Sequence, residues 1–321
     1  MKAVVVYEAG GFEQLKIVDK PVPSIKEGWS LVKVKAFGLN HSEIFTRQGL
    51  SPSVKFPRIL GIECVGEIVE TSAPKQFSVG QRIFSIMGEM GRAFDGSYAE
   101  YVLLPNKQIY PVESDLSWIT LATIPETYYT AYGSMLNLNL KPTDKILVRG
   151  ATSGVGYAFM QLVKAQFPKI KITGTTRNTD KTNKLLEVGF DQVVIDQGNM
   201  LQTTENYTKI LELIGPVSVK NSFKHLEIGG IICSTGQLGH QWYLEEFDPI
   251  RDIKEGSHLT SFYSGNINEN KIQALFNHIK DYHVKIKPEK VFSLDEIQDA
   301  HRYLESKDSF GKVVIQVDEG E

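Results

Sequence analysis

The stretch KILVRGATSGVGYAFMQLVK, residues 145–164, decides the fold of this chain. It opens with a short apolar run of strand type at residues 146–148, and a loop of small residues follows at 150–156. Apolar side chains then recur at helical spacing, as at Phe159 and Leu162. A strand that turns through glycines into a helix brings backbone N–H groups and the positive helix end to one point. The pattern therefore predicts a site for the pyrophosphate of a dinucleotide.

The loop is a degenerate form of the dinucleotide-binding fingerprint. Gly150 and Gly156 stand six residues apart, but Ser153 occupies the position of the middle glycine. Taken alone, the loop is equally well interpreted as an ordinary structural loop, so the neighbouring segments decide between the two. The residues expected to contact a cofactor here are Gly150, Ala151, Thr152, Ser153, Gly154, Val155 and Gly156.

Length and composition limit the class of protein. The chain has 321 residues, enough for two domains that each bury a core. Its net charge of −3 gives no electrostatic reason to expect nucleic acid or an anionic membrane as a partner. The first residues lack the apolar run of a signal peptide, and no run approaches the ~20 residues of a membrane helix. Cys64 and Cys233 have no metal-ligand spacing. We expect a soluble cytoplasmic protein.

Two different patterns divide the chain. Short strand signals broken by glycine and proline fill residues 1 to about 110 and predict a β-rich domain. After the glycine loop, apolar runs such as 170–176 and 192–195 alternate with helical segments. Such alternation predicts an α/β domain with a doubly wound parallel sheet. Two further helices and two further strands are expected from about residue 264 onward.

The end of the second strand carries a clue to the cofactor. In an NAD site, an acidic residue about 20 residues after the glycine loop accepts a hydrogen bond from the ribose 2′-hydroxyl. Here Arg177 stands 21 residues after Gly156, preceded by Thr176 and followed by Lys181. Cationic and hydroxyl groups suit a 2′-phosphate, which a carboxylate would repel. The alternative is that Arg177 and Lys181 are solvated surface charges. The distance of 21 residues from Gly156 to Arg177 favours the first interpretation, with NADPH as the cofactor.

Several separate motifs occur in one order along nearly the whole chain. They are MKAVVVYEAGGFEQLKI at the start, GLNHSEIFTRQG (38–49), LGIECVGEIVE (60–70), DGSYAEYVLLP (95–105), the glycine loop, GFDQVVID (189–196) and GKVVIQV (311–317). Through them the chain resembles the medium-chain dehydrogenase/reductase superfamily, in its zinc-independent NADPH:quinone oxidoreductase branch, to which zeta-crystallin belongs.

The resemblance implies a discontinuous architecture. A GroES-like catalytic domain would comprise residues 1–125 and 262–321, and a Rossmann domain that binds NADPH would be inserted as residues 126–261. It also implies a homodimer formed through the outer strand of the Rossmann sheet, near Leu259–Ser264.

The same resemblance makes the zinc question testable. In the alcohol dehydrogenases of the superfamily, a cysteine and the histidine of a Gly-His-Glu motif hold the catalytic ion. Asn40 and Ile62 stand at the matching positions, and neither is a zinc ligand. Two cysteines cannot build a four-cysteine structural site. His41 is the one stray candidate ligand, and it is more simply a polar surface or packing residue. We expect no metal.

Without a Lewis acid, an activated acceptor such as a quinone or an α,β-unsaturated carbonyl compound is the expected small-molecule substrate. Candidate catalytic residues lie in the segment 40–47. By resemblance, Asn40 lies near the nicotinamide, Glu43 and Phe45 occupy acidic and aromatic positions of the branch, and Arg47 orients Glu43 or attracts an anionic substrate. The alternatives are a structural Glu43–Arg47 ion pair and a core role for Phe45. Tyr128 is a candidate proton donor.

Further cofactor contacts are implied by the resemblance only. They are expected from Asn40, Thr127, Thr176, Arg177, Lys181, Thr235, Gly236, Phe262 and Lys312. Lys312 is equally well interpreted as a surface charge. Asp196 replaces a tyrosine that contacts the cofactor in several relatives, so that contact is expected to be lost.

Two other functions stay open. Relatives that reduce enoyl thioesters carry a tyrosine as proton donor just after the glycine of this segment, whereas Gly49 is followed by Leu50 here. That departure weakens the interpretation as an enoyl-thioester reductase and leaves the proton donor unassigned. A non-catalytic NADPH-binding protein of zeta-crystallin type is the second alternative. Because the chain has both the glycine loop and the 40–47 segment, an enzyme is favoured over a non-catalytic NADPH-binding protein.

Overall fold

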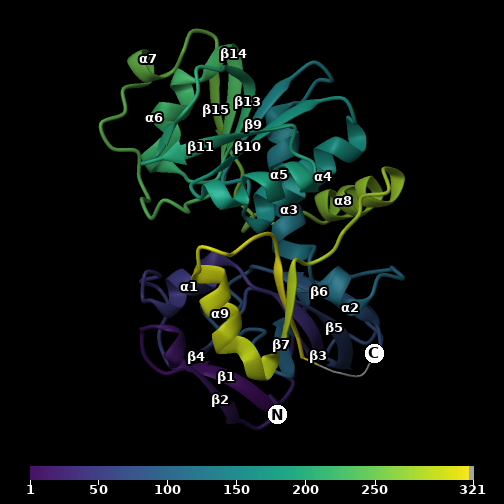
Figure 1. The fold of residues 1–321 in the computed structure, drawn as a ribbon. Coiled ribbons are helices and arrows are strands. Elements are labelled where there is room, and N and C mark those ends of the chain that lie inside the picture. Colours follow the sequence, from purple (N-terminus) through teal and green to yellow (C-terminus); the bar gives the residue numbers. More distant parts are fainter. Residues whose placement is uncertain (318–321) are drawn as a thin grey trace. The chain divides into compact units, whose positions relative to one another are not determined.

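The chain folds into two compact units, drawn in Figure 1. The computed structural model describes residues 1–317. One unit consists of Met1–Glu126 together with the residues from Ile286 onward, and the other of Thr127–Lys285. The first unit is therefore interrupted by the second along the sequence, as the predicted architecture requires. Among residues 1–317, no helix has the length and apolar character needed to cross a membrane.

The first unit is the predicted β-rich domain. Its strands are β1 (Lys2–Val6), β2 (Leu15–Asp19), β3 (Trp29–Gly38), β4 (Arg58–Ile59), β5 (Glu63–Thr71), β6 (Arg82–Ile86), β7 (Tyr101–Pro105), β8 (Tyr110–Pro111), β16 (Lys290–Ser293) and β17 (Val313–Gln316). Its helices are α1 (His41–Arg47), α2 (Trp118–Leu121) and α9 (Ile297–Glu305), with short 3-10 turns η1 (Phe12–Gln14), η2 (Asn106–Gln108) and η4 (Leu294–Glu296).

One sheet of this unit joins the two ends of the chain. Its strand order is β16-β17-β3-β5-β6-β8, and β7 also pairs with β3. Strand β17 runs antiparallel to β3 with Val314 opposite Gly38. A three-stranded sheet, β2-β1-β4, completes the unit. Apolar residues from both ends of the chain, such as Val4, Val32 and Val313, are fully buried in one core.

The second unit alternates strands and helices. Its strands are β9 (Lys145–Arg149), β10 (Lys171–Thr176), β11 (Gln192–Gln197), β12 (Met200–Leu201), β13 (Tyr207–Glu212), β14 (Leu226–Ser234) and β15 (His258–Ser261). Its helices are α3 (Pro125–Leu138), which begins at the end of the first unit, α4 (Gly154–Gln166), α5 (Thr182–Val188), α6 (Pro216–Lys224), α7 (Pro249–Asp252) and α8 (Glu269–Asp281), with the 3-10 turn η3 (Thr179–Lys181).

The sheet of the second unit confirms the predicted doubly wound topology. Its strand order is β12-β11-β10-β9-β13-β14-β15, with parallel pairing throughout except between β11 and β12. The central strand β9 holds Ile146, Leu147 and Val148, all of which are fully buried. A continuous apolar run suits a parallel strand because such a strand is covered on both faces.

The inserted unit ends later than the sequence predicted. It extends to Lys285, whereas the return to the first domain was expected at residue 262. Helix α8 accounts for the difference, because its His278 lies 3.2 Å from the carbonyl oxygen of Leu162. After the helix, the carbonyl of Lys285 accepts a hydrogen bond of 2.8 Å from the Gln161 side chain. Residues 262–285 therefore pack within the Rossmann unit.

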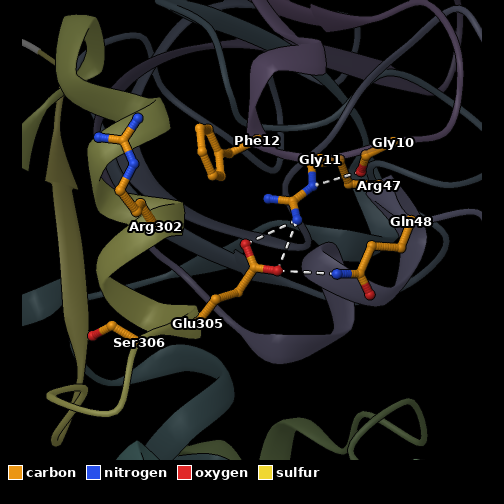
Figure 2. A pocket seen from close by; sticks show the side chains of 8 residues that line it. All are labelled: Gly10, Gly11, Phe12, Arg47, Gln48, Arg302, Glu305 and Ser306. Atoms are coloured by element: carbon orange, nitrogen blue, oxygen red, sulfur yellow. Dashed lines mark hydrogen bonds and ion pairs between the residues drawn. The ribbon is translucent and has the colours of Figure 1, made fainter.

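A buried arginine ties helix α1 to helix α9 (Figure 2). Nη2 of Arg47 lies 2.9 Å from both carboxylate oxygens of Glu305, and Nη1 lies 3.0 Å from Nδ1 of His301. Because a guanidinium only donates, Nδ1 must accept, so His301 is neutral. Burial and the Arg47 charge lower the pKa of His301 to about 3. The ion pair considered for Arg47 thus exists, but its partner is Glu305 and not Glu43.

We expect the substitution Arg47→Met to lower the free energy of unfolding by about 2–4 kcal/mol, because it leaves Glu305 and His301 without their shared donor. Urea unfolding of the purified protein at neutral pH measures the change. Arg302→Met is the control, since Arg302 lines the pocket of Figure 2 together with Arg47 but is exposed. It forms an ion pair with Asp299 one turn away and lies over the ring of Phe12. An equal decrease in the free energy of unfolding for the two variants would contradict a structural role for Arg47.

Candidate functional site

The glycine loop after β9 makes the sharp turn that the sequence predicted. Gly150 has φ of +89°, a conformation that favours glycine. Gly156 lies so close to the start of the loop that a Cβ atom there would stand 2.6 Å from the carbonyl oxygen of Gly150. The helix α4 therefore begins directly against the turn, and its first N–H groups face the loop.

Ser153, the departure from the fingerprint, has a structural function in this turn. Its Oγ accepts a hydrogen bond of 3.1 Å from the N–H of Gly156, which caps helix α4. The same hydroxyl donates to the carbonyl of Gly150 at 2.8 Å. The serine thus closes the loop with its side chain and leaves the N–H groups that follow it available for an anion.

The end of β10 places a cation beside the same loop. The hydroxyl of Thr175 accepts a hydrogen bond of 3.0 Å from the N–H of Gly150, which ties the strand to the loop. Arg177 follows β10 and is exposed. Its guanidinium forms no hydrogen bond or ion pair with any residue of the described range 1–317. Lys181 ends the turn η3, four residues further on.

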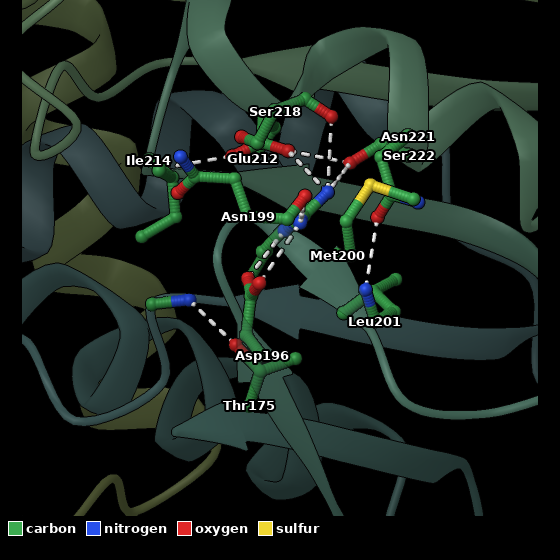
Figure 3. Close-up of polar contacts among 12 residues, drawn as sticks. Thr175, Asp196, Asn199, Met200, Leu201, Glu212, Ile214, Ser218, Asn221 and Ser222 are labelled. Carbon is green, nitrogen blue, oxygen red and sulfur yellow. Dashed lines mark hydrogen bonds and ion pairs between the residues drawn. The ribbon is translucent and has the colours of Figure 1, made fainter. Parts of the chain in front are cut away.

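A buried arginine next to the loop joins the carboxyl ends of β9, β11 and β13, and Figure 3 shows the residues that contact it. Arg149, the last residue of β9, is fully buried. Its Nε and Nη2 donate to Asp196 at 2.7 and 3.1 Å, and Nη2 also donates to the carbonyl of Asn199 at 2.6 Å. Nη1 donates to the carbonyl of Ser218 and to the hydroxyl of Ser222. Every N–H of the guanidinium therefore has an acceptor.

A second buried carboxylate belongs to this network. Glu212 ends β13, and its Oε2 lies 3.7 Å from Nη1 of Arg149 and accepts from Ser222 at 2.5 Å. Its Oε1 accepts from the backbone N–H groups of Ile214 and Gly215. Burial raises the pKa of Glu212, and the charge of Arg149 opposes that effect. The network fixes the turns at the edge of the sheet where open parallel sheets bind ligands.

The other residues predicted in this unit occupy varied environments. Tyr128 is buried and its hydroxyl donates to Gln161, so donation to a substrate would require that bond to break. Thr127 is also buried. Thr235 Oγ1 lies 3.0 Å from Ser134 Oγ. Phe262 packs over Gly133, where a Cβ atom would stand 2.1 Å from its ring.

In the first unit, residues 41–47 form helix α1, a helix that the sequence pattern did not lead us to expect. Asn40 precedes the helix, and Glu43 reaches back so that its Oε2 accepts from the N–H of Asn40 at 2.9 Å. The Asn-x-x-Glu spacing is a helix-start signal that could have revealed this arrangement. Phe45 is half-buried, and the helix ends at Arg47.

The side chain of Asn40 belongs to a buried polar cluster with Glu63 and Lys312. Its Nδ2 donates to Glu63 Oε1 at 2.9 Å, and its Oδ1 accepts from Lys312 Nζ at 2.7 Å. Lys312 Nζ also donates to Glu63 Oε1 at 2.5 Å. Glu63 Oε2 accepts from the backbone N–H of Glu126 at 2.7 Å. The structure therefore brings Asn40, Glu43 and Lys312 together and adds Glu63, which the sequence analysis missed.

Two buried carboxyl groups and one buried ammonium group belong to this cluster, and the ammonium pairs with Glu63. Glu43 and Glu63 are 1% and 0% exposed, and Lys312 is 4% exposed. Burial and the neighbouring Glu63 raise the pKa of Glu43 to about 8, against the opposing effects of Lys312 and two backbone N–H donors. At neutral pH, Glu43 accordingly carries a proton for most of the time, and Lys312 is the counterion of Glu63.

Comparisons with known proteins agree with the fold. Residues 26–114 match the family described as "Alcohol dehydrogenase GroES-like domain", and residues 188–315 match "Zinc-binding dehydrogenase". The chain is 31% identical to the quinone oxidoreductase of Homo sapiens over 255 residues, which cover 74% of each protein. It is 25% identical to the synaptic vesicle membrane protein VAT-1 homolog-like of Mus musculus, covering 99% of this chain and 82% of the relative.

Solved structures share the fold over almost the entire chain. The quinone oxidoreductase from Coxiella burnetii superposes with a TM-score of 0.85 at 24% identity, covering 99% of both chains. A mycobacterial protein, Rv1454c, solved in complex with NADPH, has a TM-score of 0.82 at 22% identity, covering 98% of this chain and 100% of that one.

The name of the second matched family raises the question of zinc, and the residues here do not fit that ion. Within residues 1–317, no group of three or more His, Cys, Asp or Glu side chains is arranged to hold a metal. Beside Asn40, the ammonium of Lys312 already neutralises Glu63. An amide and a lysine do not form the ligand set of zinc.

We expect Arg149→Met to lower the free energy of unfolding by about 3–5 kcal/mol, because it leaves two buried carboxylates without their cation. Urea unfolding measures the loss. Arg251→Met serves as the control, since Arg251 in the same unit is 85% exposed and pairs with Asp248 at the surface. If both variants unfold at the same urea concentration, the buried network contributes little to stability.

The raised pKa of Glu43 predicts a specific dependence of stability on pH. The folded protein keeps a proton on Glu43 between its ordinary pKa of 4.5 and about 8, whereas the unfolded chain releases it. The free energy of unfolding must therefore fall as pH rises through that window. Glu43→Gln should remove a fall on the order of 1–4 kcal/mol between about pH 5 and pH 8.

Urea unfolding at several pH values tests this expectation, and the slope against pH is the quantity to compare. The exposed Glu113→Gln is the control and should leave the slope of the wild type unchanged. If the free energy of unfolding depends on pH in the same way in Glu43→Gln and in the wild type, Glu43 is ionised in the folded protein.

Proposed function

Because the chain belongs to the medium-chain dehydrogenase/reductase superfamily, in its quinone oxidoreductase branch, we propose that it is a zinc-independent, NADPH-dependent oxidoreductase. Its acceptors on this proposal are quinones or α,β-unsaturated carbonyl compounds. Relatives at about 30% identity support the class of oxidoreductase, and the finer assignments rest on the residues of this chain.

The observation that carries the proposal is the turn after β9 with Arg177 beside it. The loop offers backbone N–H groups at the start of α4, where a pyrophosphate binds. Arg177 is exposed, and Thr176 rather than an acid precedes it at the end of β10. A guanidinium at that position pairs with a 2′-phosphate, so the site supports NADPH over NADH.

The first unit supports an acceptor that needs no Lewis acid. A reduced nicotinamide, when bound, supplies a hydride. Asn40, Glu63 and Lys312 supply a fixed arrangement of hydrogen-bond donors and charges, which can bind and orient a polar acceptor. Gly49 is followed by Leu50, whose side chain is 46% exposed and cannot act as a proton donor. Because relatives that reduce enoyl thioesters carry a tyrosine as proton donor at this position, the leucine favours quinones and enones as acceptors over enoyl thioesters.

Assembly as a homodimer belongs to the same proposal. Strand β15 lies at one end of the strand order of the second unit, so one of its edges is available for pairing. Pairing of two such edges would continue the sheet between two copies. Sedimentation velocity tests this, and a monomer at micromolar concentration would count against it.

We expect NADPH oxidation with a benzoquinone or a simple enone, and a preference for NADPH over NADH of at least about tenfold in kcat/KM. Arg177→Glu should remove that preference, mainly by raising the KM for NADPH, because a carboxylate repels the 2′-phosphate. Lys169→Glu reverses another exposed charge just before β10 and should leave the preference unchanged. Oxidation is followed by cofactor absorbance. Turnover restricted to a crotonyl thioester, or binding of NADPH without any turnover, would overturn the proposed reaction.

A further inference from the structure

We propose that Lys312 is a catalytic residue whose third N–H donates a hydrogen bond to the carbonyl oxygen of the acceptor, in place of a metal ion. The inference rests on the proposed function and extends it, because it assigns the group that stabilises the charge formed during reduction.

The fold holds the Lys312 ammonium in a fixed place. Lys312 immediately precedes β17, and the pairing of Val314 with Gly38 brings its side chain over the end of β3. A Cβ atom on Gly38 would stand 2.2 Å from Lys312 Cε and 2.6 Å from Nζ. The glycine at position 38 therefore leaves the space that the lysine fills.

The hydrogen bonds of this ammonium are incomplete. Nζ has three N–H donors, and two of them are used by Asn40 Oδ1 at 2.7 Å and Glu63 Oε1 at 2.5 Å. Within residues 1–317, the third donor has no acceptor, although the side chain is only 4% exposed. A buried charged donor without a partner is costly, and in native proteins it indicates a ligand or a water molecule at that place.

The surroundings make this donor a strong one. Glu63 is fully buried and holds the lysine by an ion pair and through Asn40, so the cation cannot turn away. Glu43, the other carboxyl group of the cluster, carries a proton at neutral pH and adds little negative charge. A charge-assisted donor fixed in a poorly hydrated place stabilises a developing oxyanion without reorganisation.

The chemistry requires such a donor. Addition of hydride to the β-carbon of an enone moves the electron pair of the C=C bond toward the carbonyl, and the oxygen gains negative charge. The Lys312 N–H stabilises that enolate oxygen. The α-carbon then takes a proton from water, which gives the saturated carbonyl compound and the oxidised nicotinamide. For a quinone, the same N–H stabilises the phenolate oxygen before water protonates it.

The test has to separate this function from simple neutralisation of Glu63. Lys312→Met alone leaves a buried carboxylate uncompensated and can impair folding. The double variant Lys312→Met/Glu63→Gln removes one positive and one negative charge together, so the cluster keeps its net charge. Lys35→Met/Glu67→Gln is the control, because Lys35 of β3 and Glu67 of β5 form another ion pair of the first unit, at 3.4 Å.

In steady-state assays with a quinone and an enone, we expect the Lys312/Glu63 double variant to lose about 10²–10³-fold in kcat, as measured for removal of a single oxyanion donor. The KM for NADPH should change less than about threefold, and the Lys35/Glu67 control should match the wild type. Wild-type kcat in the double variant would overturn the proposal. Retained kcat with a raised KM for NADPH would also overturn it, in favour of a cofactor contact.

A second readout needs neither cofactor nor turnover. 4-Nitrophenol mimics the enolate oxygen, and its absorbance reports its ionisation. We expect the wild type to lower the pKa of the nitrophenol, and the Lys312/Glu63 double variant to restore it by about one unit or more. A pKa equal to that of free nitrophenol in the wild type would overturn the inference. If the wild type reduces no acceptor, the proposed function fails, while this titration still decides whether Lys312 binds an oxyanion.

Discussion

The pairing of β17 with β3 is the constraint on which the first unit depends. It returns the chain after the inserted unit and brings Lys312 within 2.7 Å of Asn40, 272 positions away in sequence. Helix α9 returns with the same segment and reaches Arg47 through Glu305. The two contacts hold opposite ends of α1, so the helix that carries the candidate catalytic residues is positioned by the C-terminal segment.

Arg149 in the second unit and Lys312 in the first are both buried cations that form ion pairs with buried carboxylates, and their hydrogen bonds are arranged differently. Arg149 has an acceptor for every N–H, as expected of a group whose function is to hold strand ends together. Among the residues that the structure describes, Lys312 has acceptors for two of its three N–H groups. Removing either cation leaves a buried carboxylate, so both are expensive to lose. Of these two cations, only Lys312 has a donor left for a ligand.

The sequence predicts the local features of this protein well and the long-range ones poorly. The buried run at 146–148 and the turn at Gly150 are set by neighbouring residues, so periodicity and glycine placement reveal them. The Glu63–Lys312 pair joins residues 249 positions apart, and no local pattern contains it. The later end of the inserted unit, at Lys285, depends in the same way on contacts of α8 with distant residues. Helix α1 is different, since its Asn40–Glu43 spacing was a readable signal.

On the proposal for Lys312, an ammonium group takes the place of a metal ion, and this bears on which reactions the architecture can support. A metal ion polarises an alcohol oxygen strongly enough to favour the alkoxide, which alcohol oxidation requires. An ammonium donates a hydrogen bond to an oxyanion but does not generate one from an alcohol of ordinary acidity. Acceptors whose reduction itself forms the oxyanion, such as enones and quinones, need no more than that donor. On the proposal for Lys312, the cluster with Glu63 and Asn40 therefore selects for activated acceptors through the chemistry of its cation, independently of the shape of the substrate pocket.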